Sequence, residues 1–521
     1  LAFFLLFVFT FIGGSFVFVC SVDYSTDGAT FQFSTKNSIS SALILTPAAR
    51  WLGARVGAFD IPLERKVHKK PIPRTGGLAI AASLFLAIFI SKLIFSEALE
   101  GLCWNTLRSY CVAGGVLIFA VGFFDDLKRL SPQIKFAFQV LAASLAFYGG
   151  VRIETIFYVE VGSLYFGILS WAITVLWFVL FINAINLIDG LDGLAAGIAF
   201  FVAAVMVAVT LINGDRLTAV KFAILAGVLL GFLRYNFNPA SIFMGDGGSY
   251  FIGYVIAALA IMESIKTQVG IVILIPFVAL GIPLIDTIIA PVRRFFRGMP
   301  LFQPDKEHVH HRLLRKGLQS KNAVIVIYAI TCALCAFALV LTLIHDNKMI
   351  ALLLISLTVV TAVGIRKLGY LEYFTFDKFY GWFRDVIDGK ASQSEHMNFI
   401  NMRAEIETAE NINFLWDNIC KVLEFLRFDA GELRVTESKK TKDKTPPNPA
   451  QILSWQKQNT VQSKMMRIEV PVSVGNPVNV RLALFKNVTD EDIQPFTLRR
   501  VEYLRRSVKT ALTKIYSSKK L

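Results

Sequence analysis

The sequence predicts an all-α polytopic membrane protein of about 10–11 transmembrane helices, followed by a small cytoplasmic α/β domain. Of the 521 residues, 55% are hydrophobic and the mean hydropathy is +0.57, which is too apolar for a soluble protein. The apolar residues gather in segments of about 15–22 residues, close to the length that crosses a bilayer. After Gly364 the composition turns polar. We therefore expect a membrane domain at 1–368 and a cytoplasmic domain at 369–521.

The predicted membrane helices follow from hydropathy alone. They lie near 1–20, 78–96, 110–124, 134–149, 166–188, 194–212, 219–233, 250–264, 270–291, 323–344 and 349–365. Residues 1–20 lack the charged start and small-residue cleavage site of a signal peptide, so an anchor helix is expected there. The polar stretch 21–37 is expected to interrupt the first hydrophobic region before Ile39–Trp51 resumes it.

The net charge of +15 is explained by topology. Lys and Arg crowd into three loops, at Arg50–Arg74, Asp125–Lys135 and Arg293–Lys321. This is the positive-inside pattern, so these loops and the C-terminus are expected to be cytoplasmic. The excess of basic residues then gives no reason to expect nucleic acid as a partner, and the chain carries no nucleic-acid motif.

The C-terminal region alternates between helical and strand patterns. Apolar residues recur at helical spacing in 395–427, and Ile493–Tyr516 also has a helical pattern. Met466–Val472 and Val478–Phe485 alternate as strands do, and Lys439–Pro449 is predicted to be a linker. No catalytic constellation is identified in this region.

Acidic residues occur in three groups, each at the cytoplasmic end of a predicted helix. They are Asp125 with Asp126, Asp189 with Asp192, and Asp246. A carboxylate at a membrane boundary is costly unless it has a partner or a role. The alternative is that these residues cap helices or turns, but three groups on one side favour a cation site that handles phosphates.

The string NAINLIDGLDGLAAG is the most specific of these signals. Asn183, Asn186, Asp189 and Asp192 follow one another at steps of three, so they share one face of a helix end. Asp246 lies among glycines at the start of the next helix but one, which suits Mg²⁺ because this ion keeps its waters and takes few protein oxygens. We expect Phe243, nearby, to stack on a base.

Two basic loops supply donors for phosphate oxygens. The first contains RKVHKKPIPRTGG, whose candidates are His68, Lys70 and Arg74. The second contains DKEHVHHRLLRKG, whose candidates are listed here: His308, His310, His311 and Arg312. Zinc is disfavoured for the histidines because no Cys accompanies them and one loop contributes them all. Upstream, Asp286 is expected to form a buried ion pair or a link to the site.

Five strings in this order resemble the polyprenyl-phosphate N-acetylhexosamine-1-phosphate transferase family, of the glycosyltransferase family 4 type. They are HKKPIPRTGG, FFDDLKRLSP, NAINLIDGLDGLAAG, FMGDGGS and DKEHVHHRLL. The last string is similar to the branch that uses UDP-N-acetylglucosamine to start O-antigen, enterobacterial common antigen or teichoic acid. The peptidoglycan branch, which uses UDP-MurNAc-pentapeptide, carries a three-His run there. The C-terminal domain lies outside the resemblance.

The resemblance implies transfer of N-acetylhexosamine-1-phosphate, most specifically GlcNAc-1-phosphate, from a UDP-sugar to undecaprenyl phosphate, with release of UMP, in a bacterial inner membrane. It implies that Asp246 holds Mg²⁺, with Mn²⁺ as a substitute, and that Asp125 or Asp126 orients or deprotonates the lipid phosphate. The amides and carboxylates of residues 183–192 would bind nucleotide or metal, and the histidines with Arg312 would bind the sugar-phosphate. A homodimer stays open.

Three other readings remain at this point: a peptidoglycan-type phospho-MurNAc-pentapeptide transferase, a secondary transporter and a membrane-anchored sensor. A transporter also brings carboxylates and broken helices together, but near the midplane of the bilayer rather than at one face. A sensor explains the C-terminal domain but not the acidic groups.

Overall fold

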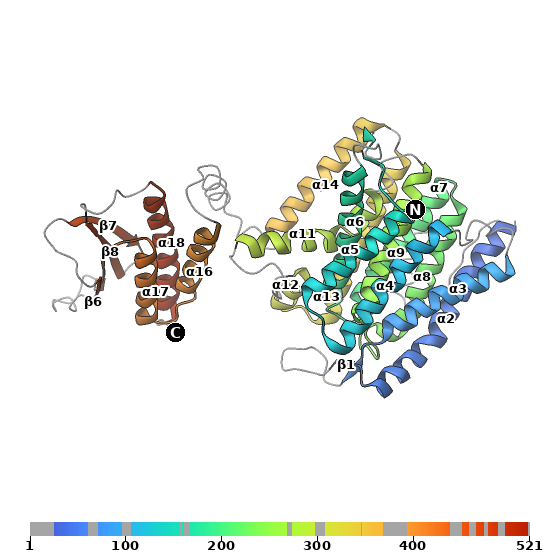
Figure 1. Ribbon diagram of the computed structural model, residues 1–521, viewed down its shortest axis with the longest axis horizontal. Coiled ribbons are helices and arrows are strands. Elements are labelled where there is room, and N and C mark those ends of the chain that lie inside the picture. The colour runs from blue at the N-terminus through green and yellow to red at the C-terminus, as the bar shows by residue number, and fades with distance from the viewer. Residues whose placement is uncertain are drawn as a thin grey trace. The chain divides into compact units, whose positions relative to one another are not determined.

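The computed structural model describes residues 26–60, 71–95, 106–156, 159–160, 167–267, 274–296, 308–344, 346–367, 393–437, 451–457, 465–473, 478–487 and 495–518. The chain divides into two compact units. The membrane unit comprises Leu1–Pro291 with Pro304–Gly369, and the C-terminal unit comprises Val292–Gln303 with Tyr370–Leu521. Figure 1 shows the elements of each unit.

The prediction of an all-α polytopic membrane fold is confirmed. Seven helices of the described part are long and apolar enough to cross a membrane. They are α3 (Gly76–Ile94), α4 (Thr106–Lys128), α6 (Gly167–Ile188), α7 (Leu194–Ile212), α8 (Arg216–Asn236), α9 (Gly245–Thr267) and α13 (Ser320–Leu343). The predicted spans near 134–149 and 349–365 are α5 (Pro132–Tyr148), a helix of 17 residues, and α14 (Asn347–Lys367), which contains the shorter apolar segment Lys348–Gly364. The predicted helix at 1–20 lies outside the described residues.

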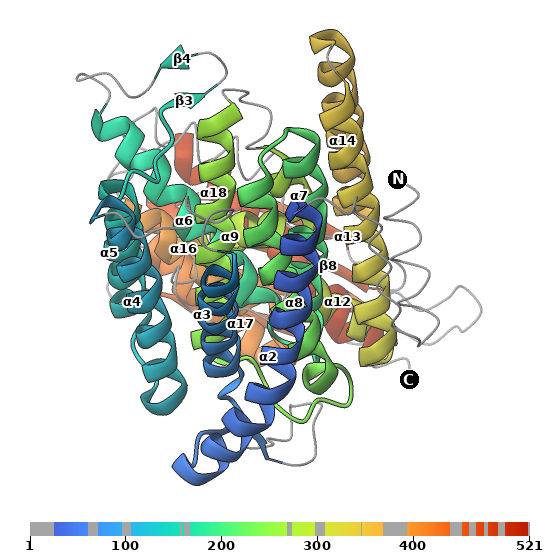
Figure 2. The same ribbon diagram turned by 90° about the vertical axis from the view of Figure 1, so that its right-hand side faces the viewer.

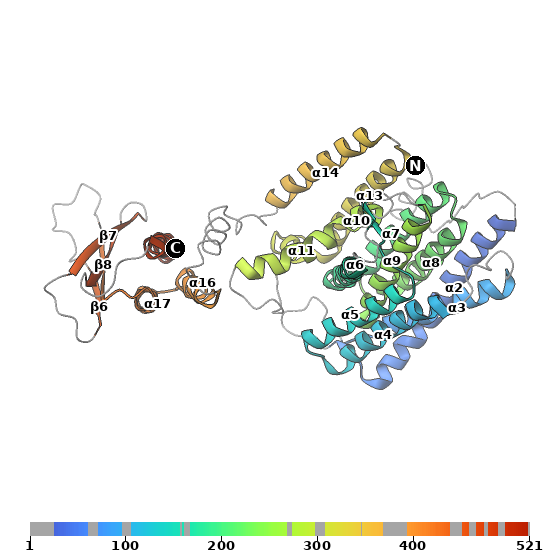
Figure 3. The same ribbon diagram turned by 45° about the horizontal axis from the view of Figure 1, so that its top comes forward.

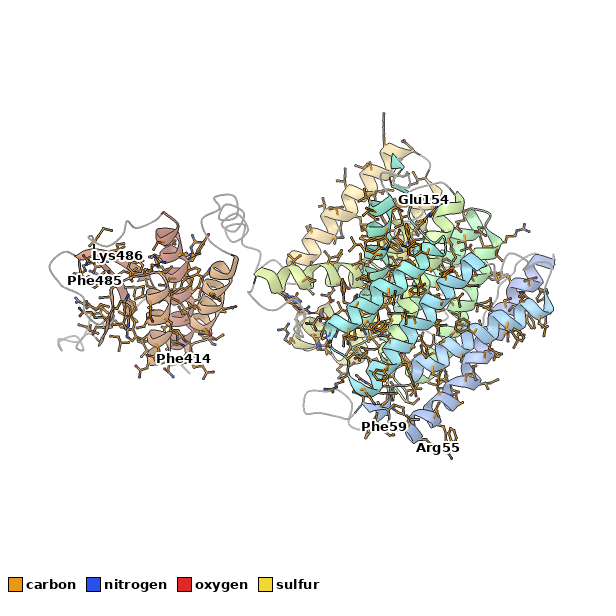
Figure 4. The ribbon with its side chains drawn as sticks, in the orientation of Figure 1. Arg55, Phe59, Glu154, Phe414, Phe485 and Lys486 are labelled. Atoms are coloured by element: carbon orange, nitrogen blue, oxygen red, sulfur yellow. The ribbon has the colours of Figure 1, made fainter. Side chains whose placement is uncertain are left out.

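The bundle has a buried centre and a lipid-facing rim. In α9, 83% of the apolar window is buried, against 39% in α4. Helices α7 and α8 pack against each other, and α9 packs against α4 and α6, as the view in Figure 3 also shows. A small two-stranded sheet, β1 (Phe59–Asp60) with β2 (Ile72–Pro73), closes one end. Arg55 and Phe59 lie at that end of the bundle and Glu154 at the other (Figure 4).

Helix α2 (Thr26–Val56) corrects one expectation. The polar stretch 21–37 does not interrupt a helix within its described part, because one helix runs from Thr26 through to Val56. The hydroxyl of Thr35 donates to the carbonyl of Phe31 in its own helix, over 2.9 Å. Ser38 fits against Gly227 of α8, where an added Cβ would lie 2.0 Å from its hydroxyl oxygen. The polar residues thus face protein and let backbones approach closely. Helices α2 and α8 run beside each other in Figure 2.

The predicted helix 270–291 is divided in the described part. One residue, Leu280, separates helix α10 (Leu274–Ala279) from helix α11 (Gly281–Phe296). Pro283 lies in the first turn of α11, where a missing N–H costs little. A short helix, α12 (Val309–Arg315), precedes α13. The remaining membrane-unit strands are β3 (Thr155–Ile156) and β4 (Val159–Glu160).

The C-terminal unit packs helices on one antiparallel sheet. Its elements are α16 (Gln393–Glu407), α17 (Ile412–Phe425), β5 (Ala430–Glu437), β6 (Gln451–Gln456), β7 (Met465–Ser473), β8 (Val478–Asn487) and α18 (Pro495–Ser518). The strand order is β6-β5-β8-β7, and the helices lie along one face of the sheet (Figure 3). The core includes Leu433, Leu482 and Leu504, all fully buried.

The two predicted strands and the last helix of this unit are present. The predicted helical region 395–427 is two helices, because Asn411 caps α17 by accepting the backbone N–H of Phe414 over 2.8 Å. Strands β5 and β6 were not predicted. The predicted linker Lys439–Pro449 lies outside the described residues.

Candidate active site

The N-terminus of α9 is built on the C-terminus of α4. Both oxygens of the Asp126 carboxylate accept backbone N–H groups, from Asp246 over 2.9 Å and from Gly247 over 3.0 Å. Gly122 permits this close packing, because an added Cβ would lie 2.6 Å from the carbonyl oxygen of Asp246. Asp126 therefore satisfies two of the N–H groups that a helix start leaves unpaired, and it fixes the position of Asp246.

Lys135 at the start of α5 joins two carboxylates from different helices. Its ammonium nitrogen lies 3.0 Å from Oδ2 of Asp125 and 3.4 Å from Oδ2 of Asp246. All three side chains are largely shielded from solvent. One ammonium thus offsets two negative charges, at the point where the ends of α4, α5 and α9 meet.

Asn186 near the end of α6 contacts the same carboxylate. Its amide nitrogen donates to Oδ1 of Asp246 over 3.1 Å and to the Ser249 hydroxyl over 3.0 Å. Both oxygens of Asp246 are therefore held by side chains from other helices. These bonds fix the rotamer of Asp246 at the mouth of α9.

Asp189 and Asp192 lie in the turn between α6 and α7. Burial, and then the negative charge of Asp246, raise the pKa of Asp189 to about 7. Asp192 instead accepts the side-chain amide of Asn238 over 3.1 Å and the backbone N–H of Ala240 over 3.0 Å. Asp189 thus belongs with Asp125, Asp126 and Asp246, which we call the carboxylate cluster, whereas Asp192 fastens the turn to the loop after α8.

Asn183, predicted to share this face, is bonded elsewhere. Its amide nitrogen donates to Oε1 of Gln139 over 2.8 Å and to the carbonyl of Val179 over 2.7 Å. Asn183 therefore links α6 to α5, one turn below Asn186. The structure brings Asn186 and Asp189 to the cluster but gives Asn183 a packing contact.

The first basic loop meets the segment before α9. The N–H groups of Gly76 and Gly77 donate to the carbonyls of Phe243 and Met244 over 2.9 and 2.8 Å. An added Cβ on Gly77 would lie 2.3 Å from the Gly248 nitrogen, so this approach requires glycine. The Arg74 guanidinium lies 3.2 Å from the Asp60 carboxylate. His68 and Lys70 lie outside the described residues.

The histidine segment is attached to α11 and to the α6–α7 turn. Asp286 accepts the backbone N–H of Val309 over 3.0 Å, and its carboxylate lies 3.3 Å from Nδ1 of His308. Asp286 thus makes the link to the site that its buried position suggested. His310 lies against Gly190, where an added Cβ would be 2.7 Å from its Nε2 atom.

The electrostatic state of this segment limits what it can offer. Burial, and then the rings of His311 and His308, lower the pKa of His310 to about 3, so this imidazole is neutral at physiological pH. It is able to donate a hydrogen bond but carries no charge. Arg312, also buried, supplies a permanent positive charge close to this imidazole in the sequence.

The donor set of the carboxylate cluster suits a hard divalent cation. Carboxylate oxygens from α4 and α9 meet there on Lys135, and burial, followed by the negative charge of Asp246, raises the pKa of Asp189. Among the described residues, no group of three or more His, Cys, Asp or Glu side chains is placed to hold a metal by itself. Mg²⁺ fits such a site, because it commonly takes one or two carboxylates and completes its shell with water and substrate phosphates.

Lys135, Ser249 and Asn238 contribute to the site and were not singled out from the sequence. Lys135 carried a signal, since it is a Lys within a span-like helix that begins directly after the Asp125–Asp126 group. Ser249 and Asn238 carried none, because their roles depend on partners 63 and 46 residues away.

These features define a polytopic membrane protein with a carboxylate-lined site at the ends of its helices. Residues 109–264 match the model of glycosyl transferase family 4. The chain belongs to this family, as the relatives below also show.

Three relatives span most of their own length in the match. A probable undecaprenyl-phosphate N-acetylglucosaminyl 1-phosphate transferase of Bacillus subtilis (strain 168) is 38% identical over 56% of this chain and 80% of the relative. A decaprenyl-phosphate N-acetylglucosaminephosphotransferase of Mycobacterium tuberculosis (strain H37Rv) is 36% identical, and the match covers 54% of this chain and 75% of the relative. An undecaprenyl-phosphate alpha-N-acetylglucosaminyl 1-phosphate transferase of Escherichia coli (strain K12) is 30% identical, and the match covers 54% of this chain and 75% of the relative.

Proposed function

We propose that the protein transfers GlcNAc-1-phosphate from UDP-N-acetylglucosamine to undecaprenyl phosphate and releases UMP. The names of the relatives support the sugar-phosphate and the polyprenyl acceptor. The observation that carries the proposal is the meeting of Asp125, Lys135, Asn186 and Asp246 from four helices at one end of the bundle. A site at helix ends suits an acceptor whose chain lies in the bilayer and whose phosphate lies at its surface.

The reaction exchanges one phosphoanhydride bond for another. An oxygen of the lipid phosphate attacks the phosphorus that carries the sugar, and the bond from this phosphorus to UMP breaks. The products are polyprenyl-diphosphate-GlcNAc and UMP, which keeps the bridging oxygen. Because both substrates are polyanions, the protein must offset their repulsion and stabilise charge on the leaving UMP.

Five residues of the site have a proposed part in this chemistry. Asp246 would hold Mg²⁺, or Mn²⁺ in its place, and Asn186 keeps its carboxylate oriented. Bound Mg²⁺ would neutralise diphosphate charge and polarise the phosphorus–oxygen bond. Asp125 would orient or deprotonate the lipid phosphate, with Lys135 beside it as a cation that the incoming phosphate can also contact. Asp126 acts as a positioning residue through α9.

The sugar-phosphate would be held from the other side of the cluster. Neutral His310 is suited to donate a hydrogen bond, and Arg312 is suited to pair with phosphate. The basic loops favour a cytoplasmic site in a bacterial inner membrane. Phe243, which is half-buried, would stack on the uracil base.

The test is UMP release by purified protein in liposomes that contain undecaprenyl phosphate. UDP-N-acetylglucosamine and UDP-MurNAc-pentapeptide are compared side by side, with Mg²⁺, with Mn²⁺ and after removal of divalent cations. We expect UMP only when lipid phosphate, divalent cation and the GlcNAc donor are all present. Preference for the pentapeptide donor would reassign the chain to the peptidoglycan-type reaction. Release of no UMP from either donor would reject the transferase proposal and reopen the transporter alternative.

A further inference from the structure

A tyrosine of α13 is seated in a notch at the start of α7. The Tyr328 hydroxyl donates to the carbonyl of Gly193 over 2.6 Å. An added Cβ on Gly197, one turn later, would lie 1.8 Å from the same hydroxyl oxygen. About one further turn along α7 lies Phe201, whose ring meets the Tyr328 ring edge-on with 5.3 Å between the ring centroids. The tyrosine therefore follows a groove that two glycines open along α7.

The notch adjoins the turn that carries Asp189 and Asp192. Gly193 is the first residue after that turn and adopts a φ of +77°, a left-handed conformation that glycine alone adopts cheaply. Its carbonyl also accepts the N–H of Gly197 over 2.9 Å, so it is the first hydrogen-bond acceptor of α7. A bond to this carbonyl fixes where α7 begins and, through it, the path of the turn.

The turn is held on two other sides. Asp192 is bonded to the loop after α8 through Asn238 and Ala240, and His310 of α12 lies against Gly190. Helices α12 and α13 pack together, so Tyr328 and His310 approach the turn from one continuous segment. Asp189 directly precedes Gly190, the first of these attached residues, and its carboxylate lies close enough to Asp246 for the two negative charges to repel each other.

We propose that Tyr328 is a positioning residue for the Asp189 turn, holding it in register with the histidine segment so that donor phosphate meets both. The proposal rests on the proposed function. Tyr328 touches no reacting atom. Its hydroxyl acts through the Gly193 carbonyl, and its ring prevents the turn from sliding along α13.

The decisive variant is Tyr328→Phe, which removes one hydroxyl and keeps the ring. Tyr254→Phe is its matched control, because the Tyr254 hydroxyl donates to the carbonyl of Cys111 over 2.7 Å, equally buried and also between two membrane helices. Loss of one such bond should change the affected constant about three- to tenfold. For Tyr328→Phe we expect this change in the KM for the UDP-sugar, with the KM for lipid phosphate unchanged. Tyr254→Phe should leave both constants unchanged.

Amide hydrogen exchange of the full-length protein in nanodiscs gives a readout that needs no activity. Tyr328→Phe should speed exchange across 189–197 and leave 245–255 unchanged. Gly197→Ala should speed exchange across 189–197 more than Tyr328→Phe does. Gly364→Ala is its control, because an added Cβ on Gly364 meets nothing within 4 Å.

The outcomes separate the two proposals. If the wild-type protein releases no UMP, the proposed function fails, and hydrogen exchange still decides the role of Tyr328. If Tyr328→Phe lowers kcat without moving the donor KM, or leaves exchange across 189–197 unchanged, Tyr328 is only a packing contact and the positioning role is rejected.

Discussion

The charged residues of the candidate site and two ion pairs on the strands of the C-terminal unit join partners at different distances along the chain. In the membrane unit, Asp126 accepts from Asp246 and Gly247, which are 120 and 121 residues away, and Lys135 reaches Asp246 across 111 residues. In the C-terminal unit, Arg434 pairs with Glu432 and Arg467 with Glu469, each only two residues away on one strand.

The charged side chains also differ in how far they are exposed to solvent. The side chains of Asp125 and Lys135 are 10% and 22% exposed, whereas those of Arg467 and Glu469 are 51% and 44% exposed. Exposed local pairs contribute little, because water already solvates both charges. Shielded pairs joined across helices fix geometry, and losing one partner leaves the other charge uncompensated. The comparison indicates that the charged residues of the candidate site fix the geometry between helices, whereas these two strand pairs do not.

Asp246→Asn should have the largest effect. Losing the proposed ligand of the cation, together with one full negative charge, should lower turnover at least about 100-fold. The matched control is Glu432→Gln, which breaks an ion pair of the C-terminal unit and should leave turnover unchanged. Both variants are assayed for UMP release in liposomes across a range of Mg²⁺ concentrations. Near wild-type turnover of Asp246→Asn at limiting Mg²⁺ would remove this residue from the metal role.

Lys135→Met should have the next largest effect. We expect turnover to fall about 10- to 100-fold, because two carboxylates would then face each other without a counterion. A double-mutant cycle with Asp125→Asn should give a coupling energy of about 1–3 kcal/mol in transition-state stabilisation. A second cycle, with Arg467→Met and Glu469→Gln, is measured on the free energy of unfolding. Its coupling energy should be less than about 1 kcal/mol. Equal coupling in both cycles would contradict the contrast between the units.

Removing residues 370–521, the larger part of the C-terminal unit, should change turnover little. Every candidate site residue precedes Gly317, so a chain ending at Gly369 should keep transfer within about twofold per folded molecule, as expected for a separate domain. Specific activity is corrected for folded protein by size-exclusion chromatography and an active-site titration. A well-folded truncated enzyme without transfer would make the C-terminal unit part of the catalytic machinery.

The smallest effect is expected at Glu502 of α18. Hydrogen bonds from Arg505 and then Arg506 lower its pKa to about 2, from an ordinary value of 4.5. A lowered pKa in the folded state stabilises the fold above pH 4.5, and this contribution is lost as the pH falls towards 2. Because the side chain is 41% exposed, the contribution is discounted to about 0.3–1 kcal/mol.

Thermal unfolding of Glu502→Gln and wild type should therefore differ at pH 7 and converge near pH 2. High salt should shrink the difference at pH 7. A difference that persists unchanged at low pH would mean that packing of the side chain, rather than its charge, stabilises α18. Turnover of the variant should match wild type at both salt concentrations.

Hydropathy predicted the membrane helices well because a span must be apolar over its whole length, whatever it packs against. It was wrong about α2, since the hydroxyls of Thr35 and Ser38 have partners in their own helix and against Gly227. In the C-terminal unit, β7 and β8 alternate clearly, whereas β6 is a short edge strand whose Ile452 is exposed, so its pattern is weak.

The candidate site was predictable in its residue types and less so in its roles. Spacing alone placed Asn183 beside Asn186, but the two amides face different neighbours, Gln139 and Asp246. Asp125 and Asp126 are adjacent and chemically identical, yet one pairs with Lys135 and the other caps α9. Which of two like residues takes which role depends on partners that the local sequence does not contain.

The sequence by itself determined that this chain crosses a membrane, and it predicted that its basic loops share one side with its acidic groups, at a cation site that handles phosphates. Those conclusions follow from the transfer free energies of single residues and from charge asymmetry, which are additive along a chain. Only the tertiary structure decided which carboxylate faces the cluster, which caps a helix and which tyrosine holds the turn. Hydrogen bonds need atoms within about 3 Å, and helices that lie more than a hundred residues apart in sequence bring those atoms together only when they pack.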